Sequence, residues 1–150
     1  MTSILDGAEV VYTYTRAQAI EDGVLVDLMQ PETVAAVKEA GFRWPVAMTS
    51  AAFHLAVAVP YKTERAGGLG RRRVRELVRC CDLQGRLWDV LWMLKSAIRQ
   101  AAPGQAVLFF EVGCVTPESP QRLRVVRLKS VAGPGDNAEP VITIMLPDED

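Results

Sequence analysis

A helical repeat of hydrophobic positions is the strongest pattern in the chain. Between residues 86 and 100, apolar side chains return every three or four positions, which predicts a long amphipathic helix that Pro103 and Gly104 end. A repeat of the same spacing begins at Arg71, and Gly85 is expected to break or kink the chain between the two helices. The apolar stripe of the long helix consists of Leu87, Val90, Leu91, Leu94 and Ile98.

Three apolar runs predict strands in the last third of the chain. Residues 106–112 and 122–131 are separated by a proline-containing loop at 116–120, which is typical of a strand and its return strand. Residues 133–137, with two glycines and a proline, are predicted to form a turn. The run at 141–146 is almost wholly apolar, which indicates a central strand covered on both faces.

The predicted strand at 122–131 carries four cations on an irregular alternation. Leu123 and Val125 share one parity, whereas Val126 and Leu128 share the other. Because a slip of one residue exchanges the two faces of a strand, we predict a β-bulge near Val125 and Val126. With that bulge, the four cations point to one solvated face; they are Arg122, Arg124, Arg127 and Lys129.

Shorter elements are predicted in the first third of the chain. Residues 10–14 and 24–28 have the composition of short strands. Between them, Thr15 and Gln18 have the spacing of a capping box, which predicts the start of a helix. Gly23 is expected to close that helix.

Two further helices are predicted before residue 60. Pro31 stands where the first residue of a helix belongs, so a short helix is expected to begin there. Thr49 or Ser50 caps a second, apolar helix, which Pro60 ends. The segment between the two helices is expected to be extended, because Trp44 precedes a proline.

These elements predict an α+β fold. A four- or five-stranded, mostly antiparallel sheet packs against the long amphipathic helix and shorter helices, and residues 1–150 form a single globular domain. Residues 62–70 are polar and contain three glycines, which predicts a mobile loop. Residues 148–150 are all acidic and are predicted to be a frayed tail.

Composition indicates a soluble, cytoplasmic protein. Hydrophobic residues make up 49% of the chain and charged residues 23%, as in ordinary globular domains. No apolar stretch approaches the ~18 residues of a membrane span, and the N-terminus has no secretion signal. Cys80, Cys81 and Cys114 are an odd number of cysteines, so no disulfide framework is expected.

Charge is distributed unevenly along a chain whose formal net charge is only −1. Residues 1–60 carry a net −4, residues 61–100 a net +6 and residues 101–150 a net −3. The basic middle suits an anionic partner, whether a phosphate backbone or an acidic protein surface, although a solvated helix face explains the same run. The predicted binding residues are Arg71, Arg72, Arg73, Arg75 and Arg79, together with the strand cations Arg122, Arg124, Arg127 and Lys129.

Aromatic side chains add secondary candidates. Tyr12, Tyr14 and Arg16 flank the start of a predicted helix, where free N–H groups favour an anion. A half-buried edge strand with solvated hydroxyls is the structural alternative for this cluster. Trp88 and Trp92 lie beside the apolar stripe of the long helix, within reach of a lysine and an arginine, and are expected to flank the core.

No residue pattern indicates a cofactor, a metal site or a catalytic centre. His54 is the only histidine, and one histidine with adjacent cysteines does not make a standard zinc site. The glycines at 67–70 lack the Lys-Ser/Thr ending of a phosphate-binding loop. No serine lies in a nucleophile elbow. A non-enzymatic function is therefore favoured, and no cofactor is expected.

Four segments resemble a known group of sequences. They are VYTYTRAQAIEDGVLVD at 11–27, AGFRWPVAMT at 40–49, GRLWDVLWM at 85–93 and GPGDNAEPVITIMLP at 133–147. Together they resemble an uncharacterised family of small bacterial proteins that plasmids and phages often carry, classed as a domain of unknown function. The resemblance implies a mobile genetic element as the source but implies no activity.

Three functions fit these observations. The first is a non-enzymatic binding protein of a mobile genetic element, for example an inhibitor of a host nucleic-acid-guided defence complex (anti-CRISPR-like). The second is direct binding of DNA or RNA through the basic residues. The third is a small metal-independent ribonuclease or toxin-like enzyme. The expected partner is a host or element-encoded protein complex, or nucleic acid, and not a membrane.

Overall fold

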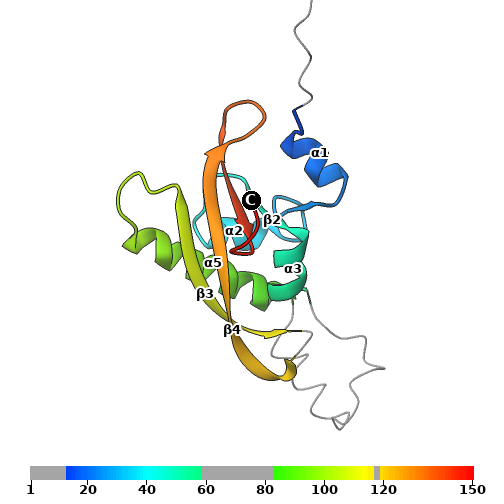
Figure 1. Ribbon diagram of the computed structural model, residues 1–150, viewed down its shortest axis with the longest axis vertical. Helices are drawn as coiled ribbons and strands as arrows, with labels where there is room; N and C mark the ends of the chain where they lie inside the picture. Colours follow the sequence, from blue (N-terminus) through cyan, green and yellow to red (C-terminus); the bar gives the residue numbers. More distant parts are fainter. Residues whose placement is uncertain (1–12, 59–82, 117–118) are drawn as a thin grey trace, which may run out of the picture.

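The computed structural model describes residues 13–58, 83–116 and 119–150, and for residues 115–123 no side chain is described. In these ranges the chain has an α+β fold with a five-stranded mixed sheet and four helices (Figure 1). The helices are α1 (Arg16–Glu21), α2 (Val34–Glu39), α3 (Ser50–Ala56) and α5 (Leu83–Gln100). The strands are β1 (Leu25–Asp27), β2 (Val46–Thr49), β3 (Val107–Thr116), β4 (Ser119–Pro134) and β5 (Pro140–Met145).

The sheet is built around its last strand. The strand order is β1-β2-β5-β4-β3. β5 runs parallel to β2 and antiparallel to β4, and the outer pairs β1–β2 and β3–β4 are antiparallel. The prediction that the apolar run at 141–146 forms a central strand is confirmed. Its buried side chains are Val141, Ile142, Ile144 and Met145.

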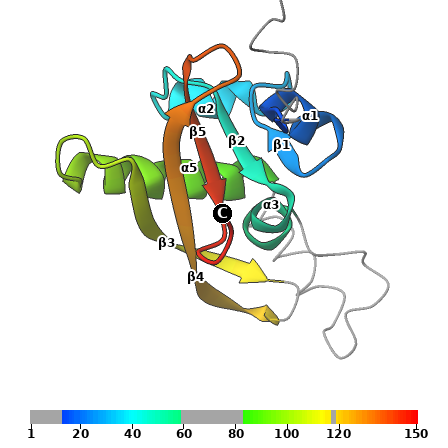
Figure 2. The ribbon, with the colours of Figure 1, turned by 45° about the horizontal axis from the view of Figure 1, so that its top comes forward.

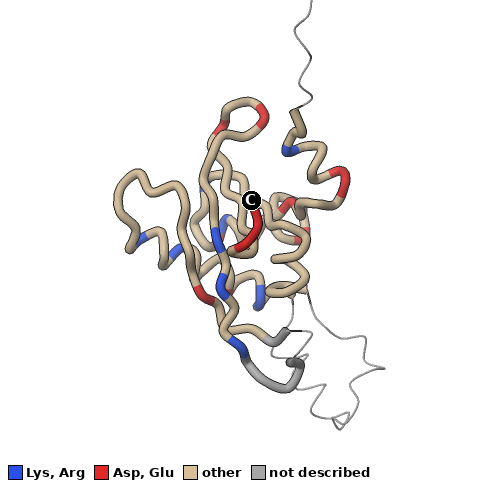
Figure 3. Tube along the Cα trace, viewed as in Figure 1, with Lys and Arg blue, Asp and Glu red and all other residues tan. Residues whose placement is uncertain are grey.

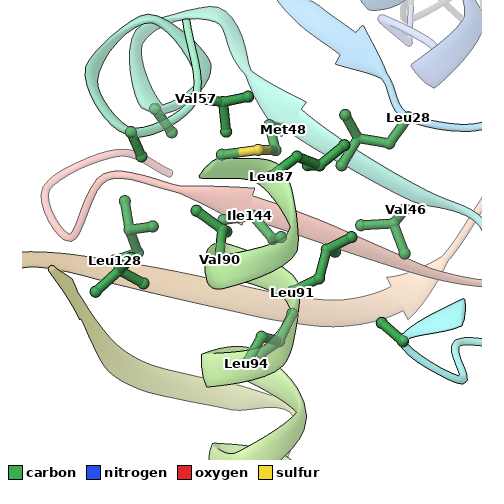
Figure 4. Packing of buried hydrophobic residues seen from close by; sticks show 14 of the residues in the cluster. Leu28, Val46, Met48, Val57, Leu87, Val90, Leu91, Leu94, Leu128 and Ile144 are labelled. Carbon is green, nitrogen blue, oxygen red and sulfur yellow. The ribbon is translucent and has the colours of Figure 1, made fainter. Parts of the chain in front are cut away.

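Helix α5 crosses one face of the sheet and buries its apolar stripe there (Figure 2). Four of the five predicted stripe residues are 0% exposed, and they pack with Met48, Leu128 and Ile144 of the sheet (Figure 4). The fifth, Ile98, is 39% exposed, so the buried stripe ends before the helix does. The four buried residues are Leu87, Val90, Leu91 and Leu94.

Helix ends in the first third follow the predicted capping chemistry. The Thr15 hydroxyl accepts a hydrogen bond from the Gln18 amide at 3.1 Å, and the Gln18 side chain accepts one from the Thr15 amide at 2.8 Å. Gly23 follows the end of α1 with φ +75°, a conformation that favours glycine. Thr49 caps α3 through a hydrogen bond from the Ala52 amide at 3.2 Å. These local signals are confirmed.

A buried arginine joins α5 to the end of α3. Arg86 is 5% exposed, and its Nε donates to the Ala56 carbonyl at 3.0 Å while Nη2 donates to the Leu55 carbonyl at 3.3 Å. Carbonyl groups in the last turn of a helix lack partners within the helix and carry partial negative charge. The guanidinium therefore satisfies the end of α3 and fixes where α5 begins to cross the sheet.

Two predicted helix boundaries are wrong. Helix α2 begins at Val34 rather than at Pro31, because the Thr33 amide closes a turn on the Gln30 carbonyl at 3.0 Å. Helix α5 begins before Gly85 and passes through it, so the chain does not break there. A glycine costs a helix interior about 1 kcal/mol, whereas burying one leucine of the stripe contributes about 1.5–3 kcal/mol.

Two strand predictions differ from the structure. Strand β2 was not predicted, because its four residues run directly into the cap of α3 and give no alternating pattern of useful length. Residues 10–12 of the strand predicted at 10–14 lie outside the described residues, and 13–14 are not in a strand. Both segments are short. For short apolar runs, pairing with other strands rather than the local pattern decides whether a strand forms.

The bulge predicted near Val125 and Val126 is also wrong. The β3–β4 ladder continues through both residues without a shift, and its irregularity lies between Cys114 and Thr116 on β3. The alternation slips because Val125 is an apolar side chain on the solvent side of the ribbon, where it is 69% exposed. The strand keeps one register, and this changes where its cations point.

Three remaining predictions concern loops, ends and the membrane. Residues 62–70 lie outside the described residues. Within the acidic end at 148–150, the Glu149 carboxylate accepts hydrogen bonds from the Thr49 hydroxyl at 2.6 Å and the Leu146 amide at 2.7 Å. No helix in the described ranges has the length and apolar composition needed to cross a membrane.

We predict that Leu91→Ala lowers the free energy of unfolding by about 2–5 kcal/mol, because it leaves a cavity where α5 meets the sheet. Chemical denaturation followed by circular dichroism measures the change. Gln100→Ala, at an exposed position of the same helix, is the control and should change the value by less than about 0.5 kcal/mol. Equal losses in the two variants would contradict this account of the core.

Candidate binding surfaces

Part of the predicted binding site lies outside the described residues. This holds for the whole arginine run and for Tyr12, and the side chain of Arg122 is also not described. For these residues the binding role stays a prediction. The arginines concerned are Arg71, Arg72, Arg73, Arg75 and Arg79.

The described cations of β4 do not share one face. Arg127 and Lys129 pair with Glu111 and Phe109 on β3, whereas Arg124 pairs with Cys114. Because successive residues of a strand alternate between its faces, Arg124 lies on the face opposite to Arg127 and Lys129. Basic positions follow one another along β4, while acidic positions gather in the β4–β5 loop and at the C-terminal end (Figure 3).

Lys129 is half-buried and contributes to the fold. Its Nζ donates a hydrogen bond to the backbone carbonyl of Glu149. The same glutamate accepts from Thr49 of β2 through its carboxylate. The C-terminal segment is thus fastened to β2 and β4 on the face turned away from α5. A lysine held in this way has less freedom to reach a partner.

Arg127 is exposed and lies against an aromatic ring. Its guanidinium carbon is 4.7 Å from the centre of the Phe109 ring, in cation–π geometry. Phe109 itself is 48% exposed, and Val107 and Val125 on the same face are 42% and 69% exposed. We call these four residues of β3 and β4 the ribbon face. It combines solvent-exposed apolar area with one positioned cation, and the exposed Glu111, the cross-strand neighbour of Arg127, lies beside it on the same face.

The backbone amides at the start of α1 already bind an anionic group, which is a carboxylate of the chain itself. The backbone amides of Arg16 and Ala17 donate to the two carboxylate oxygens of Asp136 at 2.8 and 2.9 Å. Asp136 lies in the loop between β4 and β5. The helix N-terminus thus binds a carboxylate as such sites do, and the contact fastens α1 to the sheet.

The two described side chains of the aromatic cluster near α1, Tyr14 and Arg16, are engaged in the fold. The Arg16 guanidinium donates to the Thr143 hydroxyl at 2.6 Å and to the Ile142 carbonyl at 3.1 Å. Burial lowers the pKa of Arg16, and the carboxylates of the surrounding acids act in the opposite direction. The Tyr14 hydroxyl donates to Asp22 at 2.8 Å. A groove of about 770 Å³ passes between these residues and the β4–β5 hairpin.

Helix α5 presents a second aromatic and basic group. The Trp88 and Trp92 rings stack with centroids 5.8 Å apart, and the guanidinium carbon of Arg99 lies 5.9 Å from the Trp92 ring. Lys95 instead donates to the Gly41 carbonyl at 3.0 Å and lies 5.5 Å from the Phe42 ring. Trp88 packs against the core, as expected, whereas Trp92 is 48% exposed.

The described residues hold no group of three or more histidine, cysteine, aspartate or glutamate side chains that could bind a metal ion. His54 is exposed on α3, with its ring 6.3 Å from the Phe53 ring.

Sequence reasoning missed the contribution of β3 to the surface. The run at 106–112 was interpreted as a largely apolar strand, although Val107, Phe109 and Glu111 share one parity and Leu108 and Phe110 the other. That parity was the available signal. It separates the ribbon face from the buried face once the strand is known to lie at the edge of a sheet.

The whole chain matches one family model. This model, described as a family of unknown function (DUF6573), matches residues 1–150. No curated protein and no solved structure matches the chain. The match shows which family the chain belongs to, but it assigns no activity to that family. Function therefore has to be argued from the residues of the chain itself.

We predict that Asp136→Ala lowers the free energy of unfolding by about 0.5–2 kcal/mol, because two amides at the start of α1 lose their acceptor. Hydrogen exchange at Arg16 and Ala17 should also become faster. Asp148→Ala, at an exposed position, is the control and should change neither quantity. Unchanged exchange in Asp136→Ala would show that this carboxylate does not fasten α1.

Proposed function

The chain belongs to the DUF6573 family, and from that premise we propose that it is a non-enzymatic binding protein of a mobile genetic element. It covers a surface of a host or element-encoded protein complex, for example to inhibit a nucleic-acid-guided defence complex. The observation that carries this proposal is the ribbon face, where exposed apolar side chains surround an arginine stacked on phenylalanine.

The ribbon face has the chemistry of a protein-binding centre. Aromatic residues and arginine are enriched at such centres, because they bury large apolar area and keep a polar tip. The contact with Phe109 restricts the guanidinium of Arg127, so less side-chain entropy is lost when a partner carboxylate binds it. Val107 and Val125 extend the apolar area on both sides along the strands.

The position of β3 favours a protein over other partners. Within the described part of the chain, β3 is the last strand of the sheet, and only β4 pairs with it. Its outer edge therefore presents backbone N–H and C=O groups that a strand of another chain can pair with. A partner strand added there would lie beside Phe109 and contact the ribbon face directly.

Charge adds a preference for an acidic partner surface. Residues 61–100 carry a net +6, and the basic positions of β4 lie in a different part of the sequence. The arginine run at 71–79, which lies outside the described residues, supplies five of the ten cations of residues 61–100. Complementary charge of this kind raises association rates and orients the two partners.

Direct nucleic-acid binding is the second candidate, and one observation favours it. An exposed aromatic ring beside an arginine is an arrangement that stacks unpaired bases, and Phe109 with Arg127 supplies it on a sheet surface. Arg127 itself and the arginine run would bind phosphates, whereas Arg124 lies on the opposite face of β4. A metal-independent ribonuclease or toxin-like enzyme is the third candidate, and RNA degradation by the purified protein in chelator would support it.

For the leading proposal, we predict that the tagged protein recovers a stoichiometric protein partner from a nuclease-treated host lysate. Phe109→Ala and Arg127→Glu should each weaken that complex at least tenfold, as expected for central interface residues. Arg99→Glu is the matched control, because it changes an exposed arginine that also lies over an aromatic ring. Recovery of no partner, or equal recovery by all variants, would contradict the proposal.

For nucleic-acid binding, we predict a strong salt dependence. The logarithm of the affinity for single-stranded RNA or DNA should fall linearly with the logarithm of the salt concentration. Arg127→Gln should reduce the slope by about 1, the amount expected for one lost phosphate contact. Fluorescence anisotropy measures both quantities. Affinity that is absent at low salt, or that hardly changes with salt, would exclude this candidate.

A further inference from the structure

A pocket of about 390 Å³ lies at the end of the sheet, away from the ribbon face. It opens where the last residues of α5 and the loop leading to β3 meet the ends of β3, β4 and β5 on the face that α5 covers. Its wall residues include Trp44, Ile98, Leu108, Ser130, Ala132 and Ile142.

The pocket exists because the apolar stripe of α5 ends early. Ile98, its last member, is only partly buried. The residues that follow it along the wall are small: Ala101, Ala102, Gly104 and Ala106. Close packing in a core needs side chains that fill the space between helix and sheet. Here small side chains leave the space open above the ends of the strands.

Ser130 gives the pocket one unused polar group. The residue is 4% exposed and shares its sheet face with Leu108, its cross-strand neighbour on β3. No hydrogen bond of its hydroxyl is found in the described part of the chain, and this oxygen is not among the buried side-chain atoms without a partner, so it keeps contact with solvent. A molecule in the pocket can therefore form a hydrogen bond with Ser130 in place of water.

The other polar side chain of the wall is already used by the loop. Gln105 accepts a hydrogen bond from the Ala102 amide at 3.4 Å and donates one to the Val107 carbonyl at 3.2 Å. None of the wall residues is charged. A charged molecule in this pocket would lose its hydration without gaining a partner, so the wall selects an uncharged one.

Size and shape narrow the class of molecule further. A dry cavity of roughly 150 Å³ binds benzene, and this pocket has about 390 Å³. Trp44, 45% exposed, stands at the junction of this pocket with two smaller neighbouring hollows. Its indole ring offers a flat apolar wall to a flat molecule.

We propose that this pocket binds a small, uncharged, planar aromatic molecule of about two fused rings, with one polar atom hydrogen-bonded to the Ser130 hydroxyl. The pocket is separate from the ribbon face, so this inference does not depend on the proposed function. Mostly apolar walls with one or two placed polar groups are typical of small-molecule sites of this volume.

The test uses indole as the probe and the full-length protein, followed by amide chemical shifts in NMR titrations. Indole has two fused rings, no charge and one N–H group, which can donate a hydrogen bond to the Ser130 oxygen. The expected result is saturable shifts confined to the pocket residues. Indene, which has the same shape without the N–H group, should bind about 5- to 10-fold more weakly, as for one lost hydrogen bond.

Three variants separate the contributions of the hydrogen bond and of the pocket space to indole binding. Ser130→Ala should weaken indole binding to the level of indene without lowering the thermal midpoint, because it removes a hydroxyl for which the described part of the chain offers no hydrogen bond. Ala132→Leu should abolish binding and keep or raise the midpoint, because it fills the pocket from the same sheet face. Ala51→Leu, which adds the same side chain at an exposed position of α3 outside the pocket wall, is the matched control and should bind indole normally.

Other results would overturn the proposal. Shifts that are absent at millimolar indole, or that spread over the surface without saturation, would show that the pocket does not bind such molecules. Unchanged binding by Ala132→Leu would place the probe elsewhere. If indole bound the wild type and Ser130→Ala with equal affinity, the hydrogen bond to Ser130 would not contribute to binding. The choice of ligand would then lose its basis.

Discussion

Burial of one helical stripe against the central strands is the interaction on which the other features depend. Leu87, Leu91 and Leu94 have no exposed surface, and each contributes about 1.5–3 kcal/mol to folding. Because α5 covers only one face of the sheet, the alternate residues of β3 and β4 are left in solvent and make the ribbon face. Because the stripe stops before the helix does, a pocket remains at the end of the sheet.

Several acidic groups of this chain are used to hold its parts together. A six-residue helix such as α1 is not stable alone, and Asp136 fastens it from a loop about 120 residues later in the sequence. Glu149 does the same for the C-terminal segment through Thr49 of β2. The acidic ends of the sequence are thus partly structural, whereas the charge of Arg127 stays available at the surface.

Features that depend on residues close together in the sequence could be predicted, whereas features that depend on how strands pair across the sheet could not. The capping box of Thr15 and Gln18 and the stripe of α5 depend on residues three or four positions apart, so their spacing was sufficient. The missing bulge at Val125, the short strand β2 and the pocket hydroxyl of Ser130 depend on what lies across the sheet. For the same reason Arg124 was assigned to the face of Arg127, although the register places it on the other side.

The strand order has a consequence for how the chain assembles during synthesis. β5 is the last strand of the described chain, and it separates β2 from β4 in the sheet. Until the ribosome has released residues 140–145, β1 and β2 are not joined to the β3–β4 pair by strand pairing, and the leucines of α5 have no complete sheet to pack on. Parallel pairing between distant segments forms slowly. Core residues of β2, β4 and α5 therefore lack their partner strand until residues 140–145 have emerged, and apolar surface exposed in that interval favours aggregation.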